Sequence, residues 1–166
     1  MPFPKRKHPR LNCYNYSQSG FYYVTIHNAP DGEKLSSVIG NRENNTASVI
    51  LTKYGKIVDE QIHRLPKRFS CVRVDKYVIM PTHIHMIIEL TNDSAGASPR
   101  PTLMDVVGAF KSLTTRVCNQ FFQTPNKKQF QTSFYESVLR NDTDYKERWR
   151  YIDENPLKWY LSPEDL

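Results

Sequence analysis

The chain has 166 residues, of which 39% are hydrophobic and 24% are charged. A chain of this length builds one hydrophobic core, but it is too short for a barrel of eight strand–helix units, which needs about 200 residues or more. Its 23 Lys and Arg residues exceed its 17 Asp and Glu residues, which gives a net charge of +6. We therefore expect a single domain over 1–166, with a charge that suits an anionic partner.

Neither a membrane span nor a disulfide framework is indicated. No stretch approaches the roughly 20 apolar residues that cross a bilayer, and the first residues lack the apolar run of a signal peptide. The three cysteines, Cys13, Cys71 and Cys118, lie far apart and form no CxxC pair, so we expect small packing residues. The expected location is cytoplasmic.

The first part of the chain predicts a strand and a helix. Residues 21–27 are rich in β-branched and aromatic types, which favours a strand. The polar segment that follows reads as a loop as far as Thr46, and residues 48–51 can be extended. Thr52 stands where an N-cap precedes an amphipathic helix over 53–64, and Pro66 is expected to end that helix.

The middle of the chain predicts two strands and a flexible loop. Residues 71–80 and 83–90 read as strands, and Pro81 marks the tight connection between them. Strands joined so closely are expected to be antiparallel. Residues 91–101 are low in hydrophobicity and predict a flexible loop.

The last part predicts a helix, a strand and a second helix. Thr102 is placed to cap a helix whose apolar residues repeat at three and four as far as Phe121. Residues 133–139 can form a strand, and a terminal helix over 142–154 is expected to end before Pro156. This order predicts an α+β fold similar to the ferredoxin-like split βαβ plan, with a mainly antiparallel sheet and helices packed on one face.

Two histidines begin the strand over 83–90. Side chains alternate along a strand, so His83 and His85 project from the same face, close enough to share a metal ion. Two imidazoles at the start of an otherwise apolar strand also need a compensating partner. The alternative is that both histidines only fill a half-buried strand.

The terminal helix carries an unusually placed tyrosine. At 100° per residue, Tyr145, Trp149 and Ile152 share one stripe, whereas Tyr151 and Asn155 fall outside it among charged residues. Tyr151 is then either a surface tyrosine that packs on a neighbour or a tyrosine that serves chemistry, with an amide one turn away.

Three segments together carry a resemblance to a known family. Residues 80–88, Met-Pro-Thr-His-Ile-His-Met-Ile-Ile, resemble the HUH motif of the insertion-sequence-200-like single-tyrosine transposases, in which two histidines flank a hydrophobic residue. Residues 9–26 and 151–159 are similar to the branch called REP-associated tyrosine transposases. The likeness runs from about residue 9 to 160.

The resemblance implies a fold, a reaction and a set of site residues. In such an enzyme His83 and His85 hold Mg²⁺ or Mn²⁺, and Tyr151 attacks a phosphodiester to give a 5′-phosphotyrosine and a free 3′-hydroxyl. Asn155 takes the place of the third ligand, where insertion-sequence members use Gln. Many relatives have a histidine where this chain has Ser137, so no catalytic role is expected there. By ligand type alone, two imidazoles and an amide suit zinc or nickel at least as well as magnesium.

The implied substrate is single-stranded DNA next to a hairpin. Basic residues of the arm 1–10, of the helix beginning at 103 and of the loop after it are candidates for backbone contacts. They are Lys5, Arg6, Lys7, Arg10, Lys111, Arg116, Lys127 and Lys128. The alternative is that these charges only solvate a tail and a helix face. The resemblance leaves open a monomer or a homodimer, with the tyrosine acting in cis or in trans.

Two other functions share part of this pattern of residues. A DNA-binding module could keep the fold without cutting, although retention of His83, His85 and Tyr151 argues mildly against it. Histidine-triad nucleotide hydrolases carry a third histidine two residues after the second, and this chain has Ile87 at that position.

Overall fold

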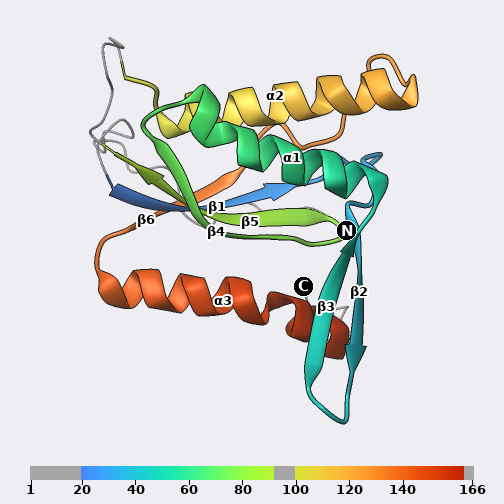
Figure 1. The fold of residues 1–166 in the computed structure, drawn as a ribbon, viewed down its shortest axis with the longest axis vertical. Helices are drawn as coiled ribbons and strands as arrows, with labels where there is room; N and C mark the ends of the chain where they lie inside the picture. Colours follow the sequence, from blue (N-terminus) through green and yellow to red (C-terminus); the bar gives the residue numbers. More distant parts are fainter. Residues whose placement is uncertain (1–19, 92–99, 163–166) are drawn as a thin grey trace.

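The computed structural model describes residues 20–91 and 100–162. Four strands form a sheet in the order β4-β5-β1-β6, and every neighbouring pair is antiparallel (Figure 1). They are β1 (Gly20–His27), β4 (Val72–Ile79), β5 (His83–Leu90) and β6 (Tyr135–Leu139). The expected α+β class and the split βαβ order of the sheet are confirmed.

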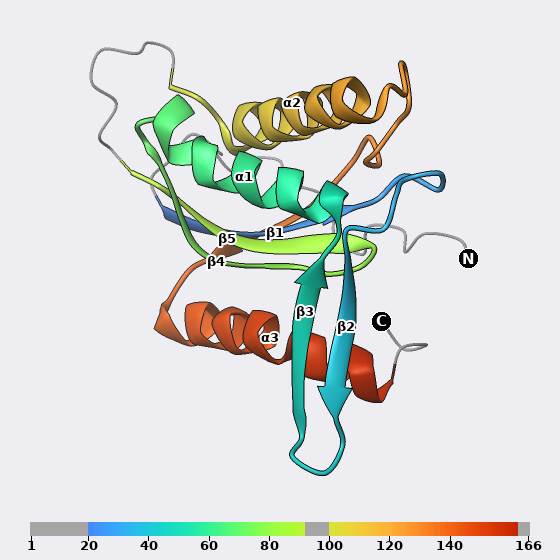
Figure 2. The ribbon, with the colours of Figure 1, turned by 45° about the vertical axis from the view of Figure 1, so that its right-hand side comes forward.

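The helices lie on both faces of this sheet. Helices α1 (Lys53–Arg68) and α2 (Leu103–Phe122) cover one face, and α3 (Asp142–Leu161) covers the other (Figures 1 and 2). The expectation that all helices pack on one face is therefore wrong for α3. The central strands carry apolar side chains on both faces: Ile84 belongs to the core beneath α1 and α2, whereas Ile87 packs with Ile152 of α3. Such a sheet needs a covering layer on each side.

A β-hairpin projects from the sheet along the C-terminal end of α3 (Figure 2). It consists of β2 (Ser36–Asn41) and β3 (Thr46–Leu51), so the polar segment expected as a loop is half of a hairpin. The hairpin approaches α3 so closely that a Cβ atom at Gly40 would lie 2.6 Å from the ring of Tyr160. A residue without a side chain is required there.

The predictions that one helix ends at Pro66 and another before Pro156 are also wrong. Pro66 lies in the last turn of α1, and Pro156 lies inside α3, which continues to Leu161. A proline within a helix removes one backbone hydrogen bond. The residues of α3 beyond Pro156 pack against the β2–β3 hairpin, and this packing favours continuation of the helix past the proline. The expected N-caps Thr52 and Thr102 are confirmed, as their side chains accept hydrogen bonds from backbone amides of the first turn.

Several expectations concern residues outside the described ranges. The basic arm 1–10, Cys13 and residues 92–99 of the expected flexible loop are among them. Cys71 and Cys118 are buried and free, as packing residues should be. Within residues 20–91 and 100–162, no helix has the length and apolar character needed to cross a membrane.

Candidate active site

His83 and His85 form a buried pair on the face of β5 that is turned toward α3. Their ring centroids lie 4.6 Å apart, and the residues are 6% and 5% exposed. Ile84 and Met86 point to the opposite core, as the alternation of a strand requires. The expectation that the two imidazoles share one face is confirmed.

One ring nitrogen of each imidazole is hydrogen-bonded to hydroxyl groups. The Nδ1 atom of His85 lies 2.7 Å from the hydroxyl of Tyr23 and 2.9 Å from that of Thr25, both on the neighbouring strand β1. The Nδ1 atom of His83 lies 3.2 Å from the hydroxyl of Thr82. A metal-binding histidine characteristically hydrogen-bonds through one nitrogen and coordinates through the other. Both Nε2 atoms are therefore the candidate ligand atoms.

Burial keeps both imidazoles neutral at neutral pH. Desolvation, reinforced by the nearby His27, lowers the pKa of His83 from 6.5 to about 4. Desolvation and the neighbouring His83 lower the pKa of His85 well below its usual value. A neutral imidazole is the form that binds metal ions.

Asn155 brings an amide from α3 to the histidine pair. Its side chain is 0% exposed, yet neither its oxygen nor its nitrogen has a hydrogen-bond partner with good geometry. The amide is near enough to His83 to oppose part of the fall in that residue's pKa. Buried polar atoms of native proteins are nearly always satisfied, so an orphaned amide next to two neutral imidazoles fits a cation site. Within the described ranges, no group of three or more His, Cys, Asp or Glu offers another.

Tyr151 meets this pair from α3. Its ring lies 5.4 Å from that of His85 and 6.3 Å from that of Tyr23, centroid to centroid. The half-buried Tyr151 also lines a hollow of about 410 Å³ between β6 and α3, together with Ser137 and Arg148. The phenol and the imidazoles therefore converge within one chain.

The predicted faces of α3 need correction. Trp149, expected in the core stripe, is 38% exposed, whereas Asn155, expected on the polar side, is fully buried. Ile152 is buried as expected. The face of α3 that covers the sheet includes polar residues because part of it covers the histidine pair, which hydrophobicity alone cannot indicate.

Two cationic side chains beside Tyr151 were not predicted from the sequence as site residues. The guanidinium carbon of Arg148 lies 4.5 Å from the ring centroid of Tyr23, and the Nζ atom of Lys158 lies 4.9 Å from that of Tyr151. They stand three residues before and seven residues after Tyr151, which is the spacing of one helix face. This spacing in the sequence could have indicated that both cations lie on the same face of the helix as Tyr151.

Other neighbours of the histidine pair had no signal in the sequence. The rings of His27 and Trp159 lie 5.6 and 5.9 Å from that of His83. Tyr23 and Thr25 reach His85 only because β1 pairs with β5 in a particular register. Such register depends on the whole sheet rather than on local spacing.

The predicted DNA-contacting cations lie elsewhere in the molecule. Lys111 and Arg116 belong to α2, across the sheet from Tyr151, and the Nζ atom of Lys111 donates to the Thr132 carbonyl at 2.8 Å. Lys127 forms an ion pair with Glu33, and Lys128 donates to the Thr132 hydroxyl at 2.8 Å. Lys5, Arg6, Lys7 and Arg10 lie outside the described ranges. Contacts of these cations with DNA stay a prediction.

No family model matches the chain, but several known proteins are similar to it. An uncharacterized protein of Haemophilus influenzae is 30% identical over 172 residues, which cover 93% of this chain and 89% of that protein. A REP-associated tyrosine transposase solved with a REP hairpin superposes with a TM-score of 0.62 and 21% identity, over 93% of this chain and 74% of that one. A Deinococcus radiodurans protein named provisionally as a transposase gives a TM-score of 0.51 and 12% identity, over 89% of this chain and 97% of that one. The chain therefore belongs to one family with the Haemophilus influenzae protein, and the resemblance to the REP-associated tyrosine transposases is confirmed in its fold.

Proposed function

We propose that this protein nicks single-stranded DNA next to a hairpin and joins strands through a covalent bond to Tyr151. The observation that carries the proposal is the meeting of Tyr151 with the buried His83–His85 pair on one face of the sheet. The transposase fold of the solved neighbours supports the reaction class, and the hairpin bound by one of them supports the substrate class.

The reaction exchanges one phosphodiester for another. The Tyr151 oxygen attacks phosphorus, the bond from phosphorus to the 3′ oxygen breaks, and a 5′-phosphotyrosine forms. The phenol loses its proton, and the departing 3′ oxygen takes one up to become a hydroxyl. A later 3′-hydroxyl can reverse the step and join a different strand, because little energy is lost in the exchange. Such chemistry suits transposition better than degradation.

The residues around Tyr151 have complementary tasks. His83, His85 and Asn155 would hold a divalent cation, Mg²⁺ or Mn²⁺, which supplies polarisation of the scissile phosphate when bound. Tyr23 fixes the orientation of His85 through the hydrogen bond to Nδ1. The half-buried Arg148 has no described carboxylate within ion-pair distance, so its guanidinium is free to bind phosphate oxygens.

A covalent-adduct assay tests the proposal. Purified protein is incubated with labelled hairpin oligonucleotides and Mn²⁺ and then run on a denaturing gel. We expect a shifted adduct with the native chain and none with Tyr151→Phe. Tyr160→Phe is the matched control, because it removes a hydroxyl from the same helix at a ring that packs against Gly40 of the β2–β3 hairpin of the protein. The Tyr160→Phe protein should still form the adduct.

Other outcomes would overturn the proposal. Hairpin binding without an adduct is the behaviour of a non-cutting DNA-binding module. An adduct undiminished in Tyr151→Phe would exclude this tyrosine as the nucleophile. Hydrolysis of phosphoramidates that survives Tyr151→Phe would favour a histidine-triad hydrolase, although the buried Ile87 occupies the position of the third histidine.

A further inference from the structure

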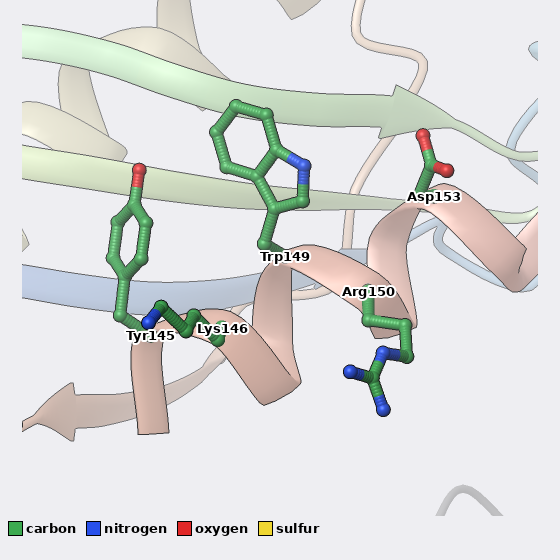
Figure 3. Close-up of a pocket in the computed structure, with 5 residues that line it drawn as sticks. All are labelled: Tyr145, Lys146, Trp149, Arg150 and Asp153. Carbon is green, nitrogen blue, oxygen red and sulfur yellow. The ribbon is translucent and has the colours of Figure 1, made fainter. Parts of the chain in front are cut away.

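A second hollow lies on α3 and shares no lining residue with the one that contains Tyr151. It has a volume of about 540 Å³ and is lined by Tyr145, Lys146, Trp149, Arg150 and Asp153. Figure 3 shows Tyr145, Trp149 and Asp153 projecting from α3 toward the strands, and Arg150 extending on the side away from them. The function proposed above assigns no task to this hollow.

Two aromatic rings form one wall of the hollow. The ring centroids of Tyr145 and Trp149 lie 6.0 Å apart, with 35° between the ring planes. Lys76 places its Nζ atom 4.8 Å from the Trp149 ring, and 38% of Trp149 is still open to solvent. Trp149 is an exposed ring of the kind on which unpaired nucleobases stack, whereas Tyr145 beside it is half-buried.

The hollow also carries two cations that form no ion pair with the described residues. Its one carboxylate, Asp153, is already paired with Lys76 at 2.7 Å. Lys146 and Arg150 are exposed, stand one turn apart and have no described carboxylate within ion-pair distance. Two like charges at this spacing destabilise a helix slightly, and a bound anion relieves the repulsion.

We propose that this hollow binds an unpaired stretch of the DNA strand. One base stacks on the exposed ring of Trp149, while Lys146 and Arg150 contact backbone phosphates. The identity of the strand rests on the function proposed above. Arg150 and Tyr151 are consecutive residues, separated by a rise of about 1.5 Å and a rotation of about 100° around α3, so a strand that follows the surface of the helix past Arg150 leads from the hollow to the nucleophile.

Binding measured without cleavage tests this subsite. Tyr151→Phe protein in EDTA is titrated into a fluorescent hairpin that has single-stranded extensions on both sides, and into the same hairpin without extensions. We expect Trp149→Ala to weaken binding of the extended hairpin at least fivefold, as loss of one base stack does, and to leave the bare hairpin unchanged. Trp149→Phe should stay within about twofold of the parent because it keeps a stacking ring.

The salt dependence of binding tests the roles of Lys146 and Arg150, and it has its own control. Lys146→Ala/Arg150→Ala should reduce the slope of log affinity against log salt by about 1.4, the value for two phosphate contacts on a single strand. Lys67→Ala/Arg68→Ala removes the same charge at the end of α1, on the other face of the sheet, and should leave the slope unchanged. Circular dichroism and thermal unfolding confirm that each variant is folded.

Three results would overturn the subsite. They are full affinity of Trp149→Ala for the extended hairpin, an equal loss on the bare hairpin, and equal salt slopes for the two double variants. Failure of the adduct assay would refute the proposed cleavage and leave these binding results standing, so the two proposals fail separately.

Discussion

The phenol ring of Tyr151 meets the imidazole of His85 edge-on, with 5.4 Å between centroids and 70° between planes. Both residues belong to one chain, so we expect each tyrosine to act at the histidine pair of its own copy. We expect a mixture of Tyr151→Phe and His85→Ala proteins to form no more adduct with a hairpin oligonucleotide and Mn²⁺ than either protein alone. Adduct regained on mixing would show that the tyrosine acts on its partner's site.

Asn155 is expected to serve cation binding at the expense of stability. A buried unsatisfied polar group costs about 1–3 kcal/mol, and both amide atoms of Asn155 are unsatisfied. In EDTA, Asn155→Leu should therefore unfold at the same or a higher temperature than the native chain. Its affinity for Mn²⁺, measured by titration calorimetry, should fall about tenfold or more.

Thr114 supplies the matched control for Asn155. Its buried hydroxyl on α2 is also unsatisfied, but it lies across the sheet from the histidine pair. Thr114→Val should keep or raise the unfolding temperature and leave Mn²⁺ affinity unchanged. Unchanged Mn²⁺ affinity in Asn155→Leu, or a loss of more than about 2 kcal/mol of stability, would show that the amide is structural.

Local periodicity predicted the histidine pair but not its surroundings. His83 and His85 share a face because alternation along a strand holds whatever else the chain does. The buried face of α3 was misassigned because Asn155 and Arg148 cover a polar site, where hydrophobicity no longer marks the interior. Strand β2 was missed because it belongs to a two-stranded extension whose outer face is exposed, which leaves its sequence polar.

The two hydroxyls on His85 are expected to act together. Either Tyr23 or Thr25 alone can still hydrogen-bond Nδ1, so each single variant, Tyr23→Phe or Thr25→Val, should bind Mn²⁺ nearly as the native chain does. The double variant leaves Nδ1 without a partner, and its affinity should fall about 10- to 100-fold. Calorimetry measures the affinity, and thermal unfolding in EDTA checks the fold. Additive losses in the single variants, or none in the double variant, would contradict this role.

Acid should destabilise the metal-free protein through the histidine pair. Burial lowers the pKa of His83 to about 4 and that of His85 well below 6.5, whereas histidines of the unfolded chain titrate near 6.5. Below pH 6.5 the unfolded state binds protons that the folded state excludes, so this stability is fully present above pH 6.5 and is lost as pH falls toward 4. The slope should reach about 1.4 kcal/mol per pH unit for each histidine.

Urea unfolding in EDTA across this pH range measures that slope. His83→Gln removes one titrating imidazole and should flatten the dependence between pH 6.5 and 4, while the remaining slope includes His85 and His27, whose pKa burial also lowers. An identical pH profile in His83→Gln would mean that the folded protein accepts a proton at this imidazole as readily as the unfolded chain does.

Arg148 is expected to stabilise the transition state more than the bound substrate. Its guanidinium lies over Tyr23 and lines the hollow that contains Tyr151, where it can meet charge that develops on the phosphate. Loss of one such donor typically costs about a hundredfold or more in rate, so Arg148→Ala should slow single-turnover adduct formation by about that factor at saturating oligonucleotide. Arg148→Lys should recover only part of the rate, because an ammonium lacks the planar fork of donors. Arg140→Ala removes an exposed arginine just before α3 and should react at the native rate. If Arg148→Ala instead weakens oligonucleotide binding and reacts at the native rate once saturated, Arg148 is a binding residue only.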